Sequence, residues 1–177
     1  YDEGRLAQAL VEFREARRRQ FRARGEGGEE AEDADLGELV RDTATAAAKA
    51  RAVADERLTI AAPDHLTMSV KKAALRRCLT NLVDNAFNAG RHVAVTLAPG
   101  ERHNLILVED DGPGIPDDRR EEAFRPFHRL DQGRNLQKGG SGLGLAIARD
   151  IARAHGGDIT LDQSAMGGLK AIIRLPI

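Results

Sequence analysis

The sequence predicts an α/β fold, a two-layer sandwich in which helices cover one face of a mixed sheet, preceded by a separate helix. Two patterns lead to this prediction. From Leu58 onward, short segments rich in branched apolar residues alternate with longer segments whose apolar residues recur every three or four positions. The length of 177 residues is enough for one sizeable hydrophobic core.

The first part of the chain divides into a helix, a linker and a second helix. Apolar residues spaced by four and three predict a helix over residues 4–23. A basic run over 14–24 gives way to an acidic run with glycines over 25–35, and this shift is typical of a linker or hinge. An alanine-rich helix is expected over 36–54. Because the chain begins inside a predicted helix and without a signal peptide, we expect it to be a piece of a longer protein.

The remaining elements alternate between strands and helices. The clearest helix spans residues 71–89, where five apolar side chains fall on one face. A turn at Pro63-Asp64 separates the first two strands, and Gly156-Gly157 ends the last helix. Residues 125–140 have little apolar content and are expected to be mobile. We expect strands at 58–61, 66–70, 92–97, 104–109, 158–161 and 170–175, a short helix at 116–124 and a longer one at 142–155.

The composition limits the possible classes of function. Lysine and arginine (27) nearly balance aspartate and glutamate (28), so the charge gives no reason to expect a nucleic-acid partner. Cys78 is the only cysteine, which excludes an internal disulfide and fits a reducing cytoplasm. No apolar run reaches the ~18 residues that a membrane span needs, so we expect no direct membrane contact.

A pair of asparagines marks the helix at 71–89. Asn81 and Asn85 are four residues apart, so their side chains project from one face. An asparagine oxygen suits Mg²⁺ that is shared with phosphates. The alternative is a polar helix face that happens to hold two asparagines, but asparagine is a poor helix former and usually needs a reason.

A second motif, Asp110-Asp111-Gly112-Pro-Gly114-Ile115, follows an apolar strand. The glycines allow a ligand to approach the backbone, and a carboxylate here could accept a hydrogen bond from the exocyclic amine of adenine. Guanine has a carbonyl at that position and would be repelled. Chemistry alone does not decide whether Asp110 or Asp111 points inward, and an ordinary acidic turn is the alternative.

A third motif, Gly140-Ser141-Gly142-Leu143-Gly144-Leu145, opens the helix expected at 142–155. Backbone N–H groups and the helix dipole at such a start suit a triphosphate. The motif differs from the Walker pattern, since no Gly-Lys-Ser/Thr follows, and from a Rossmann turn, since no strand leads directly into it.

Two phenylalanines precede this third motif. Phe124 and Phe127 could anchor a lid over the nucleotide or simply belong to the core. Arg129 and Lys138 lie within that lid and could reach phosphate.

Taken in their order along the chain, the motifs resemble the N box, first glycine box, F box (Phe124-Arg-Pro-Phe127) and second glycine box of the bacterial sensor histidine kinases. Their catalytic ATP-binding domain belongs to a superfamily shared with DNA gyrase, the MutL mismatch-repair protein and a heat-shock chaperone. The resemblance implies the Bergerat ATP-binding fold. It also implies a division into the end of a dimerisation and phosphoacceptor hairpin (1–24), a linker (25–34) and the catalytic domain (35–177).

The resemblance implies a role for individual residues. Asp110 would read adenine, Asn85 would be the Mg²⁺ ligand and Asn81 would lie near the phosphates. The implied catalytic residues are Asn81, Asn85 and Arg129. The implied residues for binding ATP are Asn81, Asn85, Asp110, Gly112, Gly114, Ile115, Phe127, Lys138, Gly140, Ser141, Gly142, Leu143, Gly144 and Leu145.

The resemblance also implies a reaction, transfer of the γ-phosphate of Mg-ATP to a histidine. In the ATPase branches a glutamate serves as the base for water where this chain has Asn81, which cannot accept a proton at neutral pH. The family's acceptor histidine is followed by an acidic residue, and none of the five histidines here fits. The acceptor is therefore expected on a hairpin that is removed or on another chain.

Further expectations come from the family. The phosphate would pass on to the receiver domain of a response regulator, and the domain would be cytoplasmic, either free or as part of a membrane-anchored sensor. The family usually has a basic residue and an aromatic residue where this chain has Asn88 and Ala89. That departure favours an alternative, a nucleotide-binding pseudokinase or docking module without transfer activity.

Overall fold

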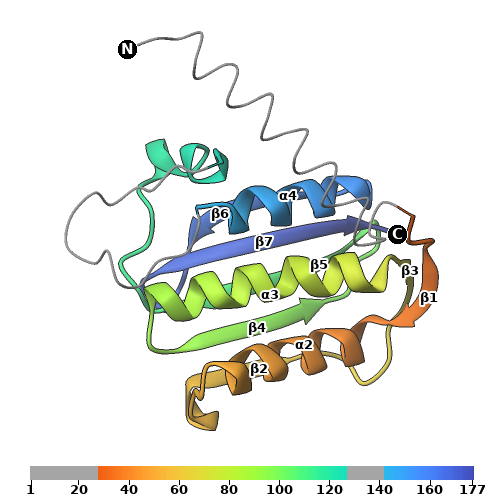
Figure 1. Cartoon of the computed structure of the whole chain (residues 1–177), viewed down its shortest axis with the longest axis horizontal. Helices are drawn as coiled ribbons and strands as arrows, with labels where there is room; N and C mark the ends of the chain where they lie inside the picture. The colour runs from red at the N-terminus through yellow and green to blue at the C-terminus, as the bar shows by residue number, and fades with distance from the viewer. Residues whose placement is uncertain (1–27, 127–141) are drawn as a thin grey trace, which may run out of the picture.

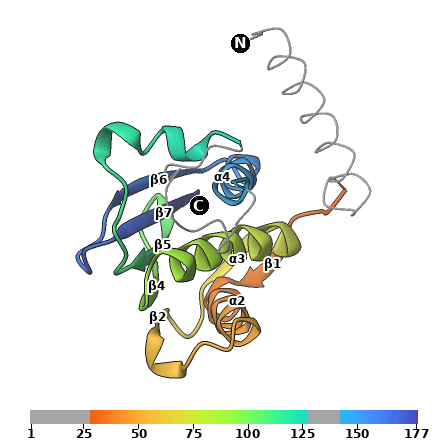
Figure 2. The same cartoon turned by 60° about the vertical axis from the view of Figure 1, so that its left-hand side comes forward.

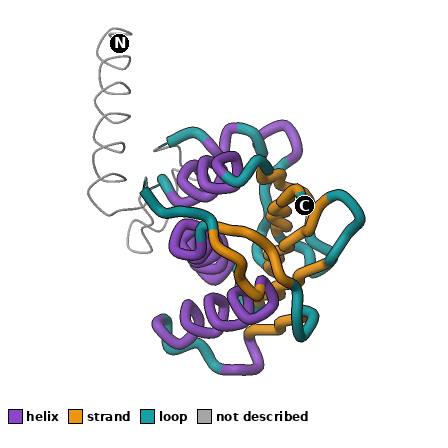
Figure 3. Tube along the Cα trace, turned by 90° about the vertical axis from the view of Figure 1, so that its right-hand side faces the viewer, coloured by secondary structure: helices purple, strands orange, loops and turns teal. Residues whose placement is uncertain are grey.

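The computed structural model describes residues 28–126 and 142–177 as two packed layers. Helices α2 (Leu36–Ala50), α3 (Lys72–Ala89) and α4 (Gly144–Ala154) lie side by side over one face of a sheet (Figures 1 and 3). Figure 2 shows α3 between the other two helices. The predicted two-layer α/β sandwich is confirmed. The helix expected over 4–23 lies outside the described residues.

The sheet has five strands and is mixed. Its order is β2 (Leu58–Ala61), β4 (Val93–Ala98), β5 (His103–Asp110), β7 (Leu169–Pro176) and β6 (Asp158–Gln163). The pair of β2 and β4 is parallel, and the other three pairs are antiparallel. Alternate residues of β5 are buried beneath the helices, namely Asn104, Ile106, Val108 and Asp110. The strand therefore directs its last side chain, a carboxylate, toward the helical layer.

Part of the segment expected as a linker is built into the fold. Strand β1 (Glu32–Asp35) pairs antiparallel with β3 (Thr67–Val70) in a separate two-stranded sheet. The two strands on either side of Pro63-Asp64 thus enter different sheets, because β2 pairs with β4 instead. The boundaries of the three predicted domains remain predictions, and the structure shows only that residues 32–34 of the expected linker pair with β3.

Two helix boundaries differ by two or more residues from those expected, and one expected helix is replaced by shorter ones. Helix α2 ends at Ala50 rather than Ala54, because Ala52 adopts a left-handed φ of 52° and donates its N–H to the carbonyl of Lys49. Helix α4 starts at Gly144 rather than Gly142, whose φ is 68°. The short helix expected at 116–124 is two 3₁₀ helices, η2 (Asp117–Arg119) and η3 (Glu122–Phe124), and a third, η1 (Asp55–Arg57), precedes β2.

The core lies between the sheet and the three helices, with α3 at its centre. The five apolar residues predicted on one face of this helix are all buried, and each contributes roughly 1.5–3 kcal/mol except the alanine, which contributes less. They are Leu75, Leu79, Leu82, Val83 and Ala86. Burial of this face fixes the rotation of α3 about its axis, and so fixes where Asn81 and Asn85 point.

Candidate functional site

The start of α4 lies against the two asparagines of α3. A Cβ built on Gly144 would be 3.8 Å from Cβ of Asn81 and 3.9 Å from Oδ1 of Asn85. Nδ2 of Asn81 is buried without a hydrogen-bond partner among the described residues. Buried polar groups are nearly always paired, so this amide is suited to an acceptor supplied by a ligand.

The first turn of α4 is suited to an anion. Its N-cap residue, Leu143, provides no side-chain hydrogen bond to the helix. Gly142 immediately before it has a φ of 68°, which favours glycine and turns the chain into the helix. Backbone N–H groups at such a start are left for an external acceptor, and the helix dipole favours a negative charge there.

Strand β5 ends in two adjacent aspartates with opposite surroundings. Asp110 is only 3% exposed, and its Oδ1 accepts hydrogen bonds from the N–H groups of Gly112 (2.8 Å) and Leu169 (3.3 Å). Burial raises the pKa of Asp110, and the two backbone hydrogen bonds oppose this effect only in part.

Asp111 faces the surface instead. It accepts hydrogen bonds from the backbone N–H groups of Arg91 (2.6 Å) and His92 (2.9 Å), and it lies 2.7 Å from Nδ1 of His92. The hydrogen bonds from the His92 backbone and ring lower its pKa to about 2. Asp110 is therefore the inward carboxylate, a choice that the sequence left open.

The first glycine motif packs tightly against its neighbours. A Cβ on Gly112 would lie 2.7 Å from the carbonyl oxygen of Ala89, the last residue of α3. Gly114 has a φ of 70°, and a Cβ there would lie 3.2 Å from the carbonyl oxygen of Gly168. The loop is thus fixed against α3 one helical turn beyond Asn85, which brings the aspartate and asparagine motifs to the same end of the molecule (Figure 1).

One residue of this site was missed by sequence reasoning. The N–H of Gly168 donates to the carbonyl of Asp110 (3.2 Å), and a Cβ on Gly168 would lie 2.2 Å from Oδ1 of the same residue. By itself, the sequence Met166-Gly167-Gly168 predicts only a turn between the last two strands. The available signal was a pair of glycines next to a strand, where one suffices for a turn.

The other residues implied by the resemblance fall into two groups. Ile115 and Leu145 are partly buried and packed against the core. Phe124 is buried as well. Outside the described residues lie Phe127, Arg129, Lys138, Gly140 and Ser141.

Asn88 and Ala89, the two departures from the family pattern, do not point to the asparagine pair. Oδ1 of Asn88 accepts a hydrogen bond from Arg51, which also pairs with Asp84 at 3.3 Å. Asn88 thus connects α3 to the end of α2. Ala89 is exposed.

A family model described as histidine kinase-, DNA gyrase B-, and HSP90-like ATPase matches residues 70–177. The chain belongs to this family. Its relatives include the sensor histidine kinase GtrS of Pseudomonas aeruginosa, which is 43% identical over 106 residues, a match that covers 60% of this chain and 22% of that protein. The sensor histidine kinase CpxA of Escherichia coli is 40% identical over 105 residues, covering 59% of this chain and 23% of CpxA. This domain therefore spans less than a quarter of these relatives.

Solved structures of such domains have the same fold. A mycobacterial sensor histidine kinase, MprB, superposes with a TM-score of 0.70 at 27% identity, covering 82% of this chain and 97% of that structure. The histidine kinase domain of the Escherichia coli osmosensor EnvZ gives a TM-score of 0.61 at 31% identity, covering 84% and 89%. The predicted resemblance to the ATP-binding domain of sensor histidine kinases is confirmed.

Neither a metal cluster nor a membrane span is found in the described part of the domain. Residues 28–126 and 142–177 contain no group of three or more His, Cys, Asp or Glu side chains that could hold a metal ion. No helix in these ranges is long and apolar enough to cross a bilayer.

Proposed function

We propose that this domain binds Mg-ATP and transfers its γ-phosphate to a histidine on a phosphoacceptor hairpin. The observation that carries the proposal is the meeting of three features at one end of the fold: the buried Asp110, the unpartnered amide of Asn81 and the glycine-led start of α4. Each is costly for folding or uncommon by itself, and together they match the parts of one nucleotide.

Adenine recognition is assigned to Asp110. Both hydrogen bonds described for this side chain reach Oδ1, so Oδ2 is the oxygen that we expect to accept from the exocyclic amine of adenine. Guanine presents a carbonyl oxygen at the same position, and two acceptors facing each other repel. The ionised carboxylate is the stronger acceptor and carries no O–H that would compete, so the raised pKa of Asp110 makes this role sensitive to acid.

The phosphates are assigned to α3 and α4. Nδ2 of Asn81 and the first N–H groups of α4 can donate to phosphate oxygens. Asn85 would offer its amide oxygen to Mg²⁺, and phosphate oxygens would supply other ligands. When bound, Mg²⁺ would neutralise part of the phosphate charge and orient the transferred group.

Transfer to histidine is preferred over hydrolysis because Asn81 occupies the position of the ATPase base. An amide cannot take a proton from water at neutral pH. The curated relatives quoted above are named as sensor histidine kinases, which supports the same choice. The acceptor would be a histidine other than the five of this chain, and the phosphate would pass to the receiver domain of a response regulator. We place the domain in the cytoplasm, free or as part of a membrane-anchored sensor.

The experiment is a calorimetric titration with a non-hydrolysable ATP analogue, with and without Mg²⁺, followed by incubation with ATP and a purified phosphoacceptor hairpin. We expect saturable binding that strengthens with Mg²⁺, and phosphate on the hairpin with little release to water. Brisk hydrolysis in the absence of the hairpin would contradict the kinase proposal. Binding without transfer to any hairpin tested would favour the pseudokinase alternative.

A further inference from the structure

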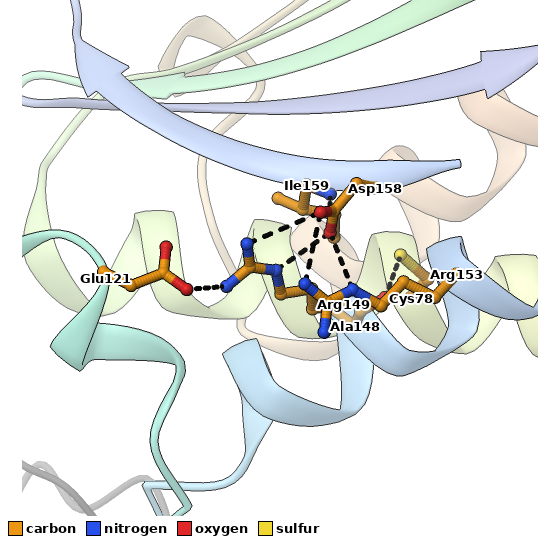
Figure 4. A network of polar contacts seen from close by, with 7 residues as sticks. All are labelled: Cys78, Glu121, Ala148, Arg149, Arg153, Asp158 and Ile159. Carbon is orange, nitrogen blue, oxygen red and sulfur yellow. Dashed lines mark hydrogen bonds and ion pairs between the residues drawn. The ribbon is translucent and has the colours of Figure 1, made fainter. Parts of the chain in front are cut away.

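A partly buried arginine connects α4 to the segment that follows the first glycine motif (Figure 4). Arg149 is only 13% exposed, and its Nε donates to Oδ1 of Asp158 at 2.8 Å. Nη1 donates to Oε1 of Glu121 at 2.5 Å. The guanidinium also stacks on the ring of Phe124, 4.2 Å from its centroid. One side chain thus holds β6 and both ends of the turn from Glu121 to Phe124.

Asp158 is itself held in place, so it is a fixed anchor for the arginine. It accepts hydrogen bonds from Nε and Nη2 of Arg153, both at 3.2 Å, and from the backbone N–H of Ile159 at 2.8 Å. An arginine fork needs a carboxylate of fixed orientation to direct its remaining N–H groups, and Asp158 provides it. With Asp158 fixing one edge of the guanidinium, the Nη1 group of Arg149 then determines where Glu121 lies.

A second arginine holds the other end of the same segment. Nε of Arg120 donates to the carbonyl of Ile115 at 3.2 Å, and Nη1 lies 2.8 Å from Oδ1 of Asp117 and 3.3 Å from Oδ1 of Asp162. Residues 115–124 are therefore tied to β6 at both ends. Because Ile115 directly follows Gly114, movement of this segment would move the first glycine motif.

We infer that Arg149 is a positioning residue for nucleotide binding, acting through Glu121 and Phe124. This inference rests on the proposed function. The adenine side of the site is the Asp110–Gly114 loop, and the phosphate side is the start of α4 beside Asn81. Arg149 stands on α4 five residues after Gly144 and holds the segment that continues from the loop. It therefore sets the separation of the two sides, and only a ligand that spans both sides depends on that separation.

The test begins with Glu121→Ala, because the Glu121 side chain is 79% exposed and its loss leaves the core intact. Affinity for a non-hydrolysable Mg-ATP analogue is expected to fall about three- to ten-fold, the effect of losing one charge-assisted hydrogen bond that is partly exposed to water. Arg149→Lys keeps the charge but loses the fork, and we expect at least the same loss. The double variant should bind no more weakly than Arg149→Lys alone, since both changes remove one connection.

Asp118→Ala is the matched control, since Asp118 is an exposed carboxylate of the same segment. The amide resonances of Gly112 and Gly114 should shift in Glu121→Ala and stay in place in the control, a signature of loop position that loss of stability alone would not produce. Unchanged affinity in both Glu121→Ala and Arg149→Lys, with a lower melting temperature, would reduce Arg149 to a structural role. No saturable binding by the unaltered domain would overturn the proposed function, and this inference with it.

Discussion

Gly168 and Asp110 are so close that no larger residue fits at position 168 without moving the carboxylate. A Cβ on Gly168 would lie 2.2 Å from Oδ1 and 2.5 Å from the carbonyl oxygen of Asp110. Both oxygens belong to the residue that we assign to adenine. The glycine thus keeps the inward carboxylate in its place.

Gly168→Ala should therefore weaken nucleotide binding. Displacement of Asp110 costs its hydrogen bond to adenine, and we expect affinity to fall by about ten-fold or more, measured by calorimetry with an ATP analogue. Gly167→Ala is the control, because Gly167 has a φ of 101° but a Cβ there meets nothing within 4 Å. That change should cost about 1–2 kcal/mol of stability through backbone strain and leave affinity unchanged. Equal losses of affinity in both variants would contradict a specific role for Gly168.

Asp110→Asn should separate function from stability. Burial raises the folded-state pKa of Asp110, so the ionised carboxylate destabilises the folded domain at neutral pH. This destabilisation disappears once the pH falls below the pKa of the unfolded state. Asparagine keeps an oxygen for the N–H groups of Gly112 and Leu169, and removes the buried charge. We expect unchanged or greater stability in urea at pH ~7 with a ten- to hundred-fold loss of affinity, from about 1.5–3 kcal/mol for a charged hydrogen bond. A variant that loses both together would argue that the carboxylate is structural.

Most of the fold was predictable because its core elements carry strong patterns. The apolar face of α3 and the alternation along β4 and β5 report burial directly. The alternation along β5 also indicates which of the two adjacent aspartates points inward. Val108 is buried, and an extension of the alternation by two residues places Asp110 inward and Asp111 outward.

The parts that sequence reasoning missed depend on contacts between distant segments. Strand β1 is made of three acidic residues and Ala34, so no alternation marks it, and it forms because β3 offers it an edge. Ala52 takes a left-handed conformation that its residue type does not signal. The role of Gly168 requires knowing that β7 pairs with β5 beside Asp110, which is a fact of topology.

The two asparagines of α3 should have separable roles. Asn85→Ala is expected to abolish the strengthening of nucleotide binding by Mg²⁺, because it removes the proposed ligand oxygen. Calorimetry with and without Mg²⁺ measures this change. The Asn81→Glu variant restores the residue type of the ATPase branches, and it should raise release of phosphate to water while lowering transfer to the hairpin. A phosphate-release assay measures this second change. Full Mg²⁺ dependence in Asn85→Ala would refute the ligand role.

Acid should unfold the domain partly through Asp158. Its pKa is lowered to about 2: burial acts to raise it, and the hydrogen bonds from Arg149 and Arg153 more than compensate. Because the unfolded state binds the proton more tightly, the stabilisation is present above pH ~4 and is lost as the pH falls toward 2. In urea titrations, Asp158→Asn should be less stable than the unaltered domain at pH ~6, and this difference should shrink toward pH ~2. Parallel curves over that range would show that the ionisation of Asp158 contributes nothing.

The start of α3 is capped by a residue from outside the helix, and this cap can be tested. The N-cap residue, Lys71, provides no side-chain hydrogen bond, and the carboxylate of Glu29 instead accepts from the N–H groups of Ala73 (2.6 Å) and Ala74 (3.1 Å). Such an anion also interacts favourably with the positive end of the helix dipole. Glu29→Ala should therefore cost about 0.5–2 kcal/mol of unfolding free energy, the usual value of a helix cap.

The neighbouring Glu30→Ala is the control for this cap, since Glu30 is exposed and one residue further along the chain. Hydrogen exchange should accelerate at Ala73 and Ala74 in the Glu29 variant and stay unchanged in the control. Because Asn81 and Asn85 lie two and three turns further along the same helix, we expect fraying at its start to leave the affinity for nucleotide within about two-fold. A larger loss would mean that the segment before β1 is coupled to the nucleotide site through α3, whereas equal stability of both variants would mean that the cap is supplied by water in solution.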